Sequence, residues 1–435
     1  MKLSTQSWIV ALVLASTVAS FGSAQQETVT VWLEDGDIAQ CTVDVLQAFD
    51  EINETANVKF ILQANQWDVT RTSIAGGVGP DVVISPGPSF AFELAKAGLV
   101  LPLEDYAASL GWDERFVDWA LSLGRVEGTL YSLPSELETL VLFYNKTLFE
   151  QNGWQVPKTM DELMSLSQTI ADAGITPFAH ANAEWRPANE WYVSAMLNHV
   201  AGPERVYQAL TGTLPWTDPS FVEAITDLDT MQQRGWFSGG LENYYTALFD
   251  DTHAALGSGE AAMNLEGSWF LSDVNNFFGE TAGNENTWDW AAFPSKSGEE
   301  TYAIGVGSTY SINGVSQVPD SAAAFIDYLF QPETQAQLAV ECGSAPSPTR
   351  INSALMDGLD PRAARLYSSI TKASDAGNYG YLTWTFWPPK SDLYIYEEVE
   401  RVWDGQLSAE DYLAGLEDTF KEELEEGDIP PIPER

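Results

Sequence analysis

The sequence predicts an α/β protein of two lobes, each with a mostly parallel β-sheet flanked by helices. The chain has 435 residues, more than one ordinary hydrophobic core can serve, so two lobes of roughly 150–200 residues each are expected. Hydrophobic residues make up 45% of the chain, which excludes a disordered protein. Near the N-terminus the order strand, helix, strand, helix, strand indicates parallel strands joined by right-handed crossovers.

Five segments carry that order. Glu27 to Leu33 alternates apolar and polar residues and is rich in β-branched side chains, which predicts a strand. Cys41 to Ile52 has apolar residues at helical spacing. Val58 to Leu62 is the second expected strand and Trp67 to Ile74 the second helix. Val82 to Ile84 is a short apolar run that completes the unit as a buried strand.

Two loops of this unit are candidate ligand loops. In parallel sheets, ligands contact the loops beyond the carboxyl ends of the strands. Here those loops are E-D-G-D, starting at Glu34, and S-P-G-P, starting at Ser85. We therefore expect Glu34, Asp35, Asp37 and Ser85 to contact a ligand.

A second polar segment lies where the chain first leaves this unit. Glu136 and Glu138 follow Pro134 and directly precede the apolar run Leu140 to Tyr144. The run is too apolar for an exposed edge, which predicts a central strand. Residues two apart in a strand share a face, so both carboxylates are expected to point to one side.

Later segments combine acids, amides and indoles. The stretch H-A-N-A-E-W-R mixes all three types, and the run L-E-G-S-W follows a predicted strand. The glycines of G-V-G permit close approach of a ligand. The run T-W-T-F-W-P-P holds two prolines, which exclude a central strand or a helix interior. Gly307, Trp384 and Trp387 are candidate ligand residues in these segments; for one of Trp384 and Trp387, the alternative is a place in the core.

Taken in order, these segments resemble the extracytoplasmic solute-binding proteins of sugar importers, the family that includes maltodextrin-binding protein. The resemblance rests on G-P-D-V-V-I-S-P-G-P-S-F, on the segment around Glu138, on the run that ends at Trp269, and on the aromatic segment around Trp384. It implies the two-lobe periplasmic-binding-protein fold, a sugar bound between the lobes, and delivery of that sugar to a membrane permease. The family pattern includes a carboxylate at the first crossing and a tryptophan that stacks on sugar. The resemblance therefore implies ligand contacts for Glu136, Glu138, Asn182, Glu184, Trp185, Glu266 and Trp269; for Trp269 the alternative is a place in the core.

The resemblance also implies three hinge crossings, expected near Pro134–Glu138, Trp290–Phe293 and Cys342–Ser347. The first lobe would then comprise residues 25–136 and 292–345, and the second lobe residues 137–291 and 346–435. The first ligand loop lacks the Lys or Arg of maltodextrin-binding protein, so maltodextrin specificity is not implied.

The net charge of the chain limits the classes of partner and ligand that it can bind. The formal net charge is −43, which excludes nucleic-acid binding because that needs a basic surface. It favours a neutral or cationic ligand over an anionic one. The only histidines, His180, His199 and His253, are scattered, so no metal and no cofactor are expected. We expect a monomer.

Residues 1–24 are predicted to be an export signal, with Lys2, the apolar run Trp8 to Ala15, and a small-residue cleavage site ending at Ala24. Export implies a periplasmic or secreted protein, in which a disulfide is permitted. Cys41 and Cys342 are the only cysteines; they either form one disulfide, which would place both in one lobe, or are unrelated thiols.

Two alternative functions remain open at this point. Paired acids with tryptophans also describe a glycoside hydrolase, which needs two carboxyl groups roughly 5–10 Å apart. A binding protein for another solute, such as a polyol phosphate, a peptide or an opine-like amine, is the second alternative. A phosphate is expected to need Lys or Arg at a helix N-terminus, and Arg186 is the only cation in a candidate ligand loop.

Overall fold

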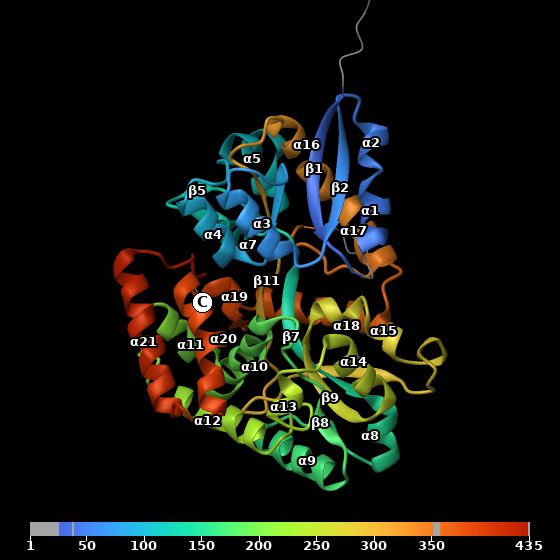
Figure 1. The fold of residues 1–435 in the computed structure, drawn as a ribbon, viewed down its shortest axis with the longest axis vertical. Coiled ribbons are helices and arrows are strands. Elements are labelled where there is room, and N and C mark those ends of the chain that lie inside the picture. The colour runs from blue at the N-terminus through green and yellow to red at the C-terminus, as the bar shows by residue number, and fades with distance from the viewer. Residues whose placement is uncertain (1–25, 37–38, 351–356, 434–435) are drawn as a thin grey trace, which may run out of the picture.

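The computed structural model describes residues 26–36, 39–350 and 357–433 and shows two lobes, one above the other in Figure 1. Each lobe has its own β-sheet with helices packed on it, so the predicted two-lobe α/β class is confirmed. The expected export signal, residues 1–24, lies outside the described residues, and so does Asp37.

The first lobe is built on a five-stranded sheet with the order β2-β1-β3-β12-β6. Its strands are β1 (Glu27–Glu34), β2 (Ala56–Gln63), β3 (Val82–Ser85), β6 (Leu133–Pro134) and β12 (Thr309–Ile312). The first three are parallel, as the sequence predicts, whereas β12 runs antiparallel to both β3 and β6. The sheet therefore ends, on the side of the other lobe, at the carboxyl ends of β1 and β3 (Figure 1).

Helices cover both faces of this sheet. They are α1 (Ala39–Leu46), α2 (Phe49–Ile52), α3 (Gln66–Ala75), α4 (Pro88–Lys96), α5 (Glu104–Leu110), α6 (Trp112–Arg115), α7 (Asp118–Ser122), α16 (Pro319–Leu329) and α17 (Pro332–Cys342), with a small hairpin of β4 (Arg125–Val126) and β5 (Thr129–Leu130). The single helix expected over Cys41 to Ile52 is two short helices, α1 and α2.

Cys41 and Cys342 form a disulfide, with their Cα atoms 5.7 Å apart. It joins α1 to the last residue of α17 across 301 residues of sequence. Both helices pack in the first lobe, so the disulfide lies within one lobe, as the sequence analysis expected.

The second lobe is built on a larger sheet with the order β13-β11-β7-β9-β8, in which β10 also pairs with β7. Its strands are β7 (Leu137–Asn145), β8 (Thr176–Phe178), β9 (Ala261–Gly267), β10 (Trp288–Ala292), β11 (Ala303–Val306) and β13 (Gly380–Tyr381). The expectation of a mostly parallel sheet is wrong here, because β7 is antiparallel to β9, β10 and β11. The reason is topological: β7 carries the chain away from the first lobe, and those three strands return toward it.

The helices of the second lobe surround this sheet. They are α8 (Lys146–Asn152), α9 (Met160–Asp172), α10 (Asn189–Met196), α11 (Pro203–Leu210), α12 (Pro219–Gln233), α13 (Leu241–Tyr244), α14 (Phe249–Ser258), α15 (Val274–Phe277), α18 (Pro361–Asp375), α19 (Thr383–Phe386), α20 (Pro389–Trp403) and α21 (Ala409–Glu426), with short helical turns η1 (Arg186–Ala188), η2 (Leu197–Ala201), η3 (Ser268–Leu271) and η4 (Glu280–Ala282). Three tryptophans, Trp216, Trp236 and Trp387, are fully buried in this lobe. Part of the high tryptophan content therefore serves the core.

Three crossings join the lobes, and backbone hydrogen bonds hold them side by side. The amide of Ser135 donates to the carbonyl of Ser308 (2.8 Å), and the amide of Gly307 donates to the carbonyl of Glu136 (3.0 Å). The amide of Leu137 donates to the carbonyl of Pro346 (2.9 Å). The first and third crossings fall where the sequence analysis placed them.

The expected second crossing, Trp290–Phe293, is wrong. β10 lies there, paired with β7 inside the second sheet, and β11 follows in the same sheet. The chain crosses only after β11, at Gly307 and Ser308, so residues 292–302 and β11 do not join the first sheet. The chain crosses later than expected because β11 adds one more strand to the second sheet before the crossing.

None of the helices within the described residues combines the length and the apolar character needed to cross a membrane.

Removal of the disulfide should destabilise the first lobe. Cys41→Ser with Cys342→Ser is expected to cost about 2–4 kcal/mol, because the bond restricts the unfolded chain. Thermal unfolding followed by circular dichroism measures the loss. A reducing agent should lower the midpoint of the natural protein to that of the double variant and leave the variant unchanged; an equal effect on both proteins would contradict the assignment.

Candidate functional site

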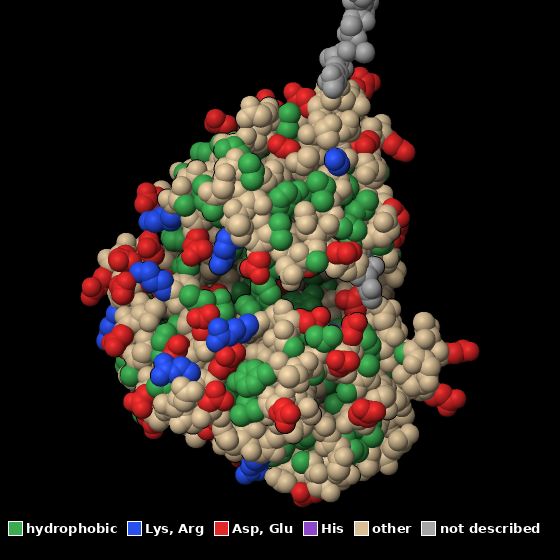
Figure 2. Space-filling view, viewed as in Figure 1, with side chains coloured by type: hydrophobic (Ala, Val, Ile, Leu, Met, Phe, Trp, Pro, Cys, Tyr) green, Lys and Arg blue, Asp and Glu red, His purple; other side chains and the backbone are tan. Residues whose placement is uncertain are grey.

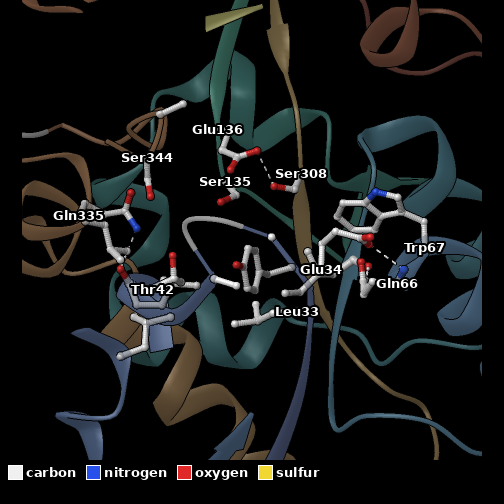
Figure 3. A pocket seen from close by; sticks show the side chains of 18 of the residues that line it. Leu33, Glu34, Thr42, Gln66, Trp67, Ser135, Glu136, Ser308, Gln335 and Ser344 are labelled. Carbon is white, nitrogen blue, oxygen red and sulfur yellow. Dashed lines mark hydrogen bonds between the residues drawn. The ribbon is translucent and has the colours of Figure 1, made fainter. Parts of the chain in front are cut away.

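A cavity of about 300 Å³ lies at the hinge, beyond the carboxyl ends of β1 and β3. Figure 3 shows Leu33 and Glu34 of β1 on one side of it and Glu136 on the other. Figure 2 shows a hollow between the lobes on the same face, with acidic side chains spread around it. The cavity is lined by Leu33, Glu34, Gly36, Ala39, Thr42, Leu46, Gln66, Trp67, Ile84, Ser135, Glu136, Asp273, Ser308, Tyr310, Leu329, Gln335, Leu338, Ser344 and Ala345. These residues come from the first lobe and from all three crossings, and Asp273 comes from the second lobe.

Glu34, a predicted ligand residue, lines this cavity, and its carboxylate already has partners. Its two oxygens accept hydrogen bonds from the backbone amides of Asn65 (3.0 Å) and Gln66 (2.7 Å). Those amides are at the N-terminus of α3, where a negative charge is stabilising. Glu34 therefore fixes the start of α3 and thereby the position of Gln66 in the cavity.

Gln66 is the most informative polar side chain of the cavity. Its amide nitrogen donates to the hydroxyl of Thr70 (3.0 Å) and to the carbonyl of Ile84 (3.4 Å). A carbonyl only accepts, so this contact fixes the orientation of the amide. The amide oxygen, Oε1, is buried and has no hydrogen-bond partner among the described residues; the same holds for Oγ of Ser85. Buried polar atoms are normally paired, so hydroxyl or N–H donors of a ligand suit this site.

Glu136 brings a carboxylate to the cavity from the first crossing. The hydroxyl of Ser308, on the second crossing, donates to its Oε2 (2.7 Å). Burial raises the pKa of Glu136 above its usual value, and the bonds from Ser308 oppose that shift. No Lys, Arg or His is among the described residues that line the cavity. The cavity therefore suits a neutral or cationic solute better than a phosphate.

Glu138 lies two residues further on and is buried. The indole of Trp384 donates to its Oε2 (3.1 Å). A Cβ atom on Gly307 would overlap the Glu138 carboxylate, so this position of the second crossing has room only for glycine. Burial, and next the negative charge of Glu136, raise the pKa of Glu138 well above its usual value, against the hydrogen bond from Trp384.

Three indole rings extend in a row from Glu138 into the second lobe. We call these residues, Trp384, Trp269 and Trp191, the indole cluster. The rings of Trp269 and Trp384 meet edge to face with their centroids 5.9 Å apart, and those of Trp191 and Trp269 are 5.3 Å apart. The indole of Trp269 donates to Oε1 of Glu266 (2.8 Å). Trp269 itself is half-buried, so part of its ring is accessible. The structure thus brings together the predicted residues Glu138, Glu266, Trp269, Gly307 and Trp384.

Trp387 does not belong to this group. It is fully buried and packs on Trp216 with the ring centroids 5.2 Å apart, so its expected contact with a ligand is wrong. The segment expected to be a loop is instead α19, and the second proline of the pair begins α20, where the missing N–H costs nothing. Trp384 and Trp387 are three residues apart, but only Trp384 faces the crossings.

Two other predicted residues have structural partners. The amide of Asn182 donates to Asn189 (3.1 Å) and to Glu400 of α20 (3.2 Å) and is buried. Glu184 is exposed and accepts from the amide of Phe249 (2.5 Å) at the start of α14. Both side chains therefore hold helices of the second lobe in place.

Trp185 is half-buried against the core of the second lobe. Asp35 is exposed just beyond β1. Neither lines the cavity.

The sequence analysis missed Gln66, Trp67, Asp273 and Ser308 as cavity residues. Gln66 and Trp67 begin α3, in a stretch that reads simply as an amphipathic helix. Asp273 lies shortly beyond Trp269, and Ser308 follows Gly307, so both adjoin residues that were predicted. Within the described residues, no group of three or more His, Cys, Asp and Glu is placed to hold a metal ion.

Two sheets joined by three hydrogen-bonded crossings, with a cavity at their junction, define a two-lobe protein with a candidate ligand site at its hinge. Residues 47–358 match the model of the bacterial extracellular solute-binding proteins. The chain belongs to that family.

Curated relatives share part of the chain. The alpha-glucosides-binding periplasmic protein AglE of Rhizobium meliloti is 28% identical over 282 residues, 59% of this chain and 58% of AglE. The multiple sugar-binding protein of Streptococcus mutans is 24% identical over 291 residues, 66% of each chain. The matched stretch thus spans less than two thirds of either relative. A probable sugar-binding periplasmic protein of Brucella suis is 24% identical over 80% of each chain.

Solved structures share the fold over almost the whole molecule. A chitin oligosaccharide binding protein superposes with a TM-score of 0.76 at 22% identity, covering 91% of this chain and 98% of that one. The protein RafE in complex with raffinose gives a TM-score of 0.70 at 21% identity, covering 91% and 99%. At these identities the likeness establishes the two-lobe fold.

Glu138→Gln should stabilise the protein at neutral and alkaline pH. A carboxyl whose pKa is raised in the folded state binds more protons folded than unfolded, so its contribution to stability falls as pH rises above its ordinary value near 4.5. Glutamine keeps an acceptor for Trp384 and carries no charge. The unfolding midpoint of the variant should therefore exceed that of the natural protein at pH 8, and the gap should close as pH falls toward 4.5.

Glu114→Gln is the matched control, because Glu114 is exposed. It should leave the midpoint almost unchanged at both ends of the pH range. A Glu138→Gln midpoint that is lower than that of the natural protein at pH 8 would contradict the account of Glu138.

Proposed function

We propose that this protein is the extracytoplasmic carbohydrate-binding component of an ABC importer. It captures a sugar between its two lobes and delivers it to a membrane permease without altering it. One observation carries the proposal: a hinge cavity rich in hydrogen-bond acceptors and free of Lys, Arg and His among its described lining residues adjoins a carboxylate-linked indole cluster. The relatives named above, two of which are named as periplasmic, support it.

The chemistry of the site suits a sugar. Sugars present apolar C–H faces and many hydroxyls; indoles cover the faces, and carboxylate and amide oxygens accept from the hydroxyls. Glu136 and Gln66 provide acceptors in the cavity. Trp269, half-buried and already linked to Glu266, provides a fixed stacking surface. Trp67 lines the cavity from the opposite lobe.

Capture proceeds by hinge closure. The crossings at Ser135–Leu137, Gly307–Ser308 and Pro346 allow the two separately packed cores to rotate as bodies. The lobes already touch away from the hinge, where Ser89 donates to the carbonyl of Trp387 (2.6 Å) and Lys96 pairs with Asp428 (3.0 Å). A ligand that contacts both lobes selects this closed arrangement, because those contacts exist only there.

The alternatives fit less well. A polyol phosphate needs cations, and no Lys, Arg or His lines the described cavity; Arg186 is paired with Glu397 and Glu400 instead. In a hydrolase, the acids flank the bond that breaks, whereas Glu138 is covered by Trp384 and Gly307. We therefore propose a binding protein rather than an enzyme, exported to the periplasm or beyond and acting as a monomer.

A ligand screen tests the proposed function. Thermal unfolding is measured with mono- and disaccharides, and with glycerol 3-phosphate and amino acids as the competing classes. A sugar that binds should raise the midpoint by an amount that grows with the logarithm of its concentration over its Kd, while the phosphate and amino acids should not. No shift with any sugar, or release of reducing ends from an oligosaccharide over hours, would contradict the proposal.

Trp269→Ala should weaken sugar binding by about 2 kcal/mol, roughly thirty-fold in Kd, because truncation removes the stacking surface. Isothermal titration calorimetry measures the change. Trp154→Ala is the matched control: Trp154 is also a half-buried indole of the second lobe, packed on Phe149, and lies outside the indole cluster. Equal Kd values for the Trp269 and Trp154 variants would remove Trp269 from the site.

A further inference from the structure

We propose that the ligand cleft is closed at one end by direct contact between α4 of the first lobe and α19 of the second. The protein would then take a sugar of one or two rings and reject longer chains. This inference rests on the proposed function and specifies the size of the ligand, which the sequence leaves open.

The contact between the two helices is backbone against backbone. Gly87 precedes α4 with a φ of 94°, and a Cβ atom there would lie 2.8 Å from the carbonyl oxygen of Trp384 and 3.3 Å from that of Gly307. Two residues on, the hydroxyl of Ser89 donates to the carbonyl of Trp387 (2.6 Å). A sugar ring cannot pass where the two backbones leave no room for a methyl group.

This wall is continuous with the cavity. Ser308 and Glu136 line the cavity, while the residues beside them in the chain, Gly307 and Glu138, are packed into the wall. The indole of Trp384 fills the space next to them and donates to Glu138. A ligand in the cavity therefore meets a closed surface in the direction of α4 and α19.

The size of the cavity gives the same answer. Its volume of about 300 Å³ is at the lower end of the range for small-molecule sites. A cavity of this size suits a small ligand, such as a sugar of one or two rings, better than a longer chain.

Two buried polar atoms at or next to the cavity lining have no hydrogen-bond partner among the described residues. Gln66 lines the cavity with an oriented, buried Oε1 that has no partner among the described residues. Ser85, which follows the lining residue Ile84, also has a buried Oγ with no hydrogen-bond partner among the described residues. Hydroxyls of a terminal ring satisfy such atoms, whereas the interior of a long chain, which has fewer free hydroxyls per ring, satisfies them less well.

Two chain-length series test the proposal by isothermal titration calorimetry: glucose, maltose and maltotriose, and galactose, melibiose and raffinose. In whichever series binds, the trisaccharide should bind at least ten-fold more weakly than the better of its two shorter members. A trisaccharide that binds as tightly as the disaccharide would overturn this inference and leave the proposed function intact. Absence of binding by all six sugars would overturn both.

Trp384→Ala tests where the wall lies. Removal of the indole opens space beside Gly87 and Glu138, so the affinity for the trisaccharide relative to the disaccharide should rise about ten-fold, even where both affinities fall. Trp387→Phe is the control, because Trp387 is buried in the core beside Trp216 and should leave the ratio unchanged. An unchanged ratio in Trp384→Ala would overturn the assignment of the wall to α4 and α19.

Discussion

The hydrogen bonds among the three crossings are the interaction on which the rest of this structure depends. Glu136 accepts from Gly307 through its backbone and from Ser308 through its side chain, and the neighbouring Leu137 donates to Pro346. Backbone bonds of this kind keep three distant segments in register. They place the cavity where the segments meet, between two separately packed cores.

Acidic side chains are concentrated at this junction, where burial leaves them poorly hydrated. Glu136 and Glu138 are close enough for the charge of one to raise the pKa of the other, and Asp273 faces the cavity from the second lobe. Such an arrangement costs stability in the folded protein. In the proposed function, a ligand rich in hydroxyl donors would compensate for part of that cost.

Much of the fold was accessible from local patterns. The alternation in β1, the short apolar run of β3 and the glycine-bounded helices predicted the first strand–helix unit. The predicted export made the disulfide between Cys41 and Cys342 plausible. The second crossing was misplaced because β10 and β11 are both short strands beside glycines and prolines, and nothing local says in which sheet a short strand pairs.

By itself, the sequence indicated the two-lobe class, because strand and helix periodicity are local properties, and the resemblance of its ordered segments to known proteins indicated the family. Only the tertiary structure decided which candidates meet. Trp384 reaches Glu138, whereas Trp387, three residues on, is in the core beside Trp216. Gln66, within an ordinary helix, becomes a cavity residue because Glu34 fixes the start of α3. The physical reason is that burial and contact depend on residues far apart in the chain, whose mutual positions no local pattern records.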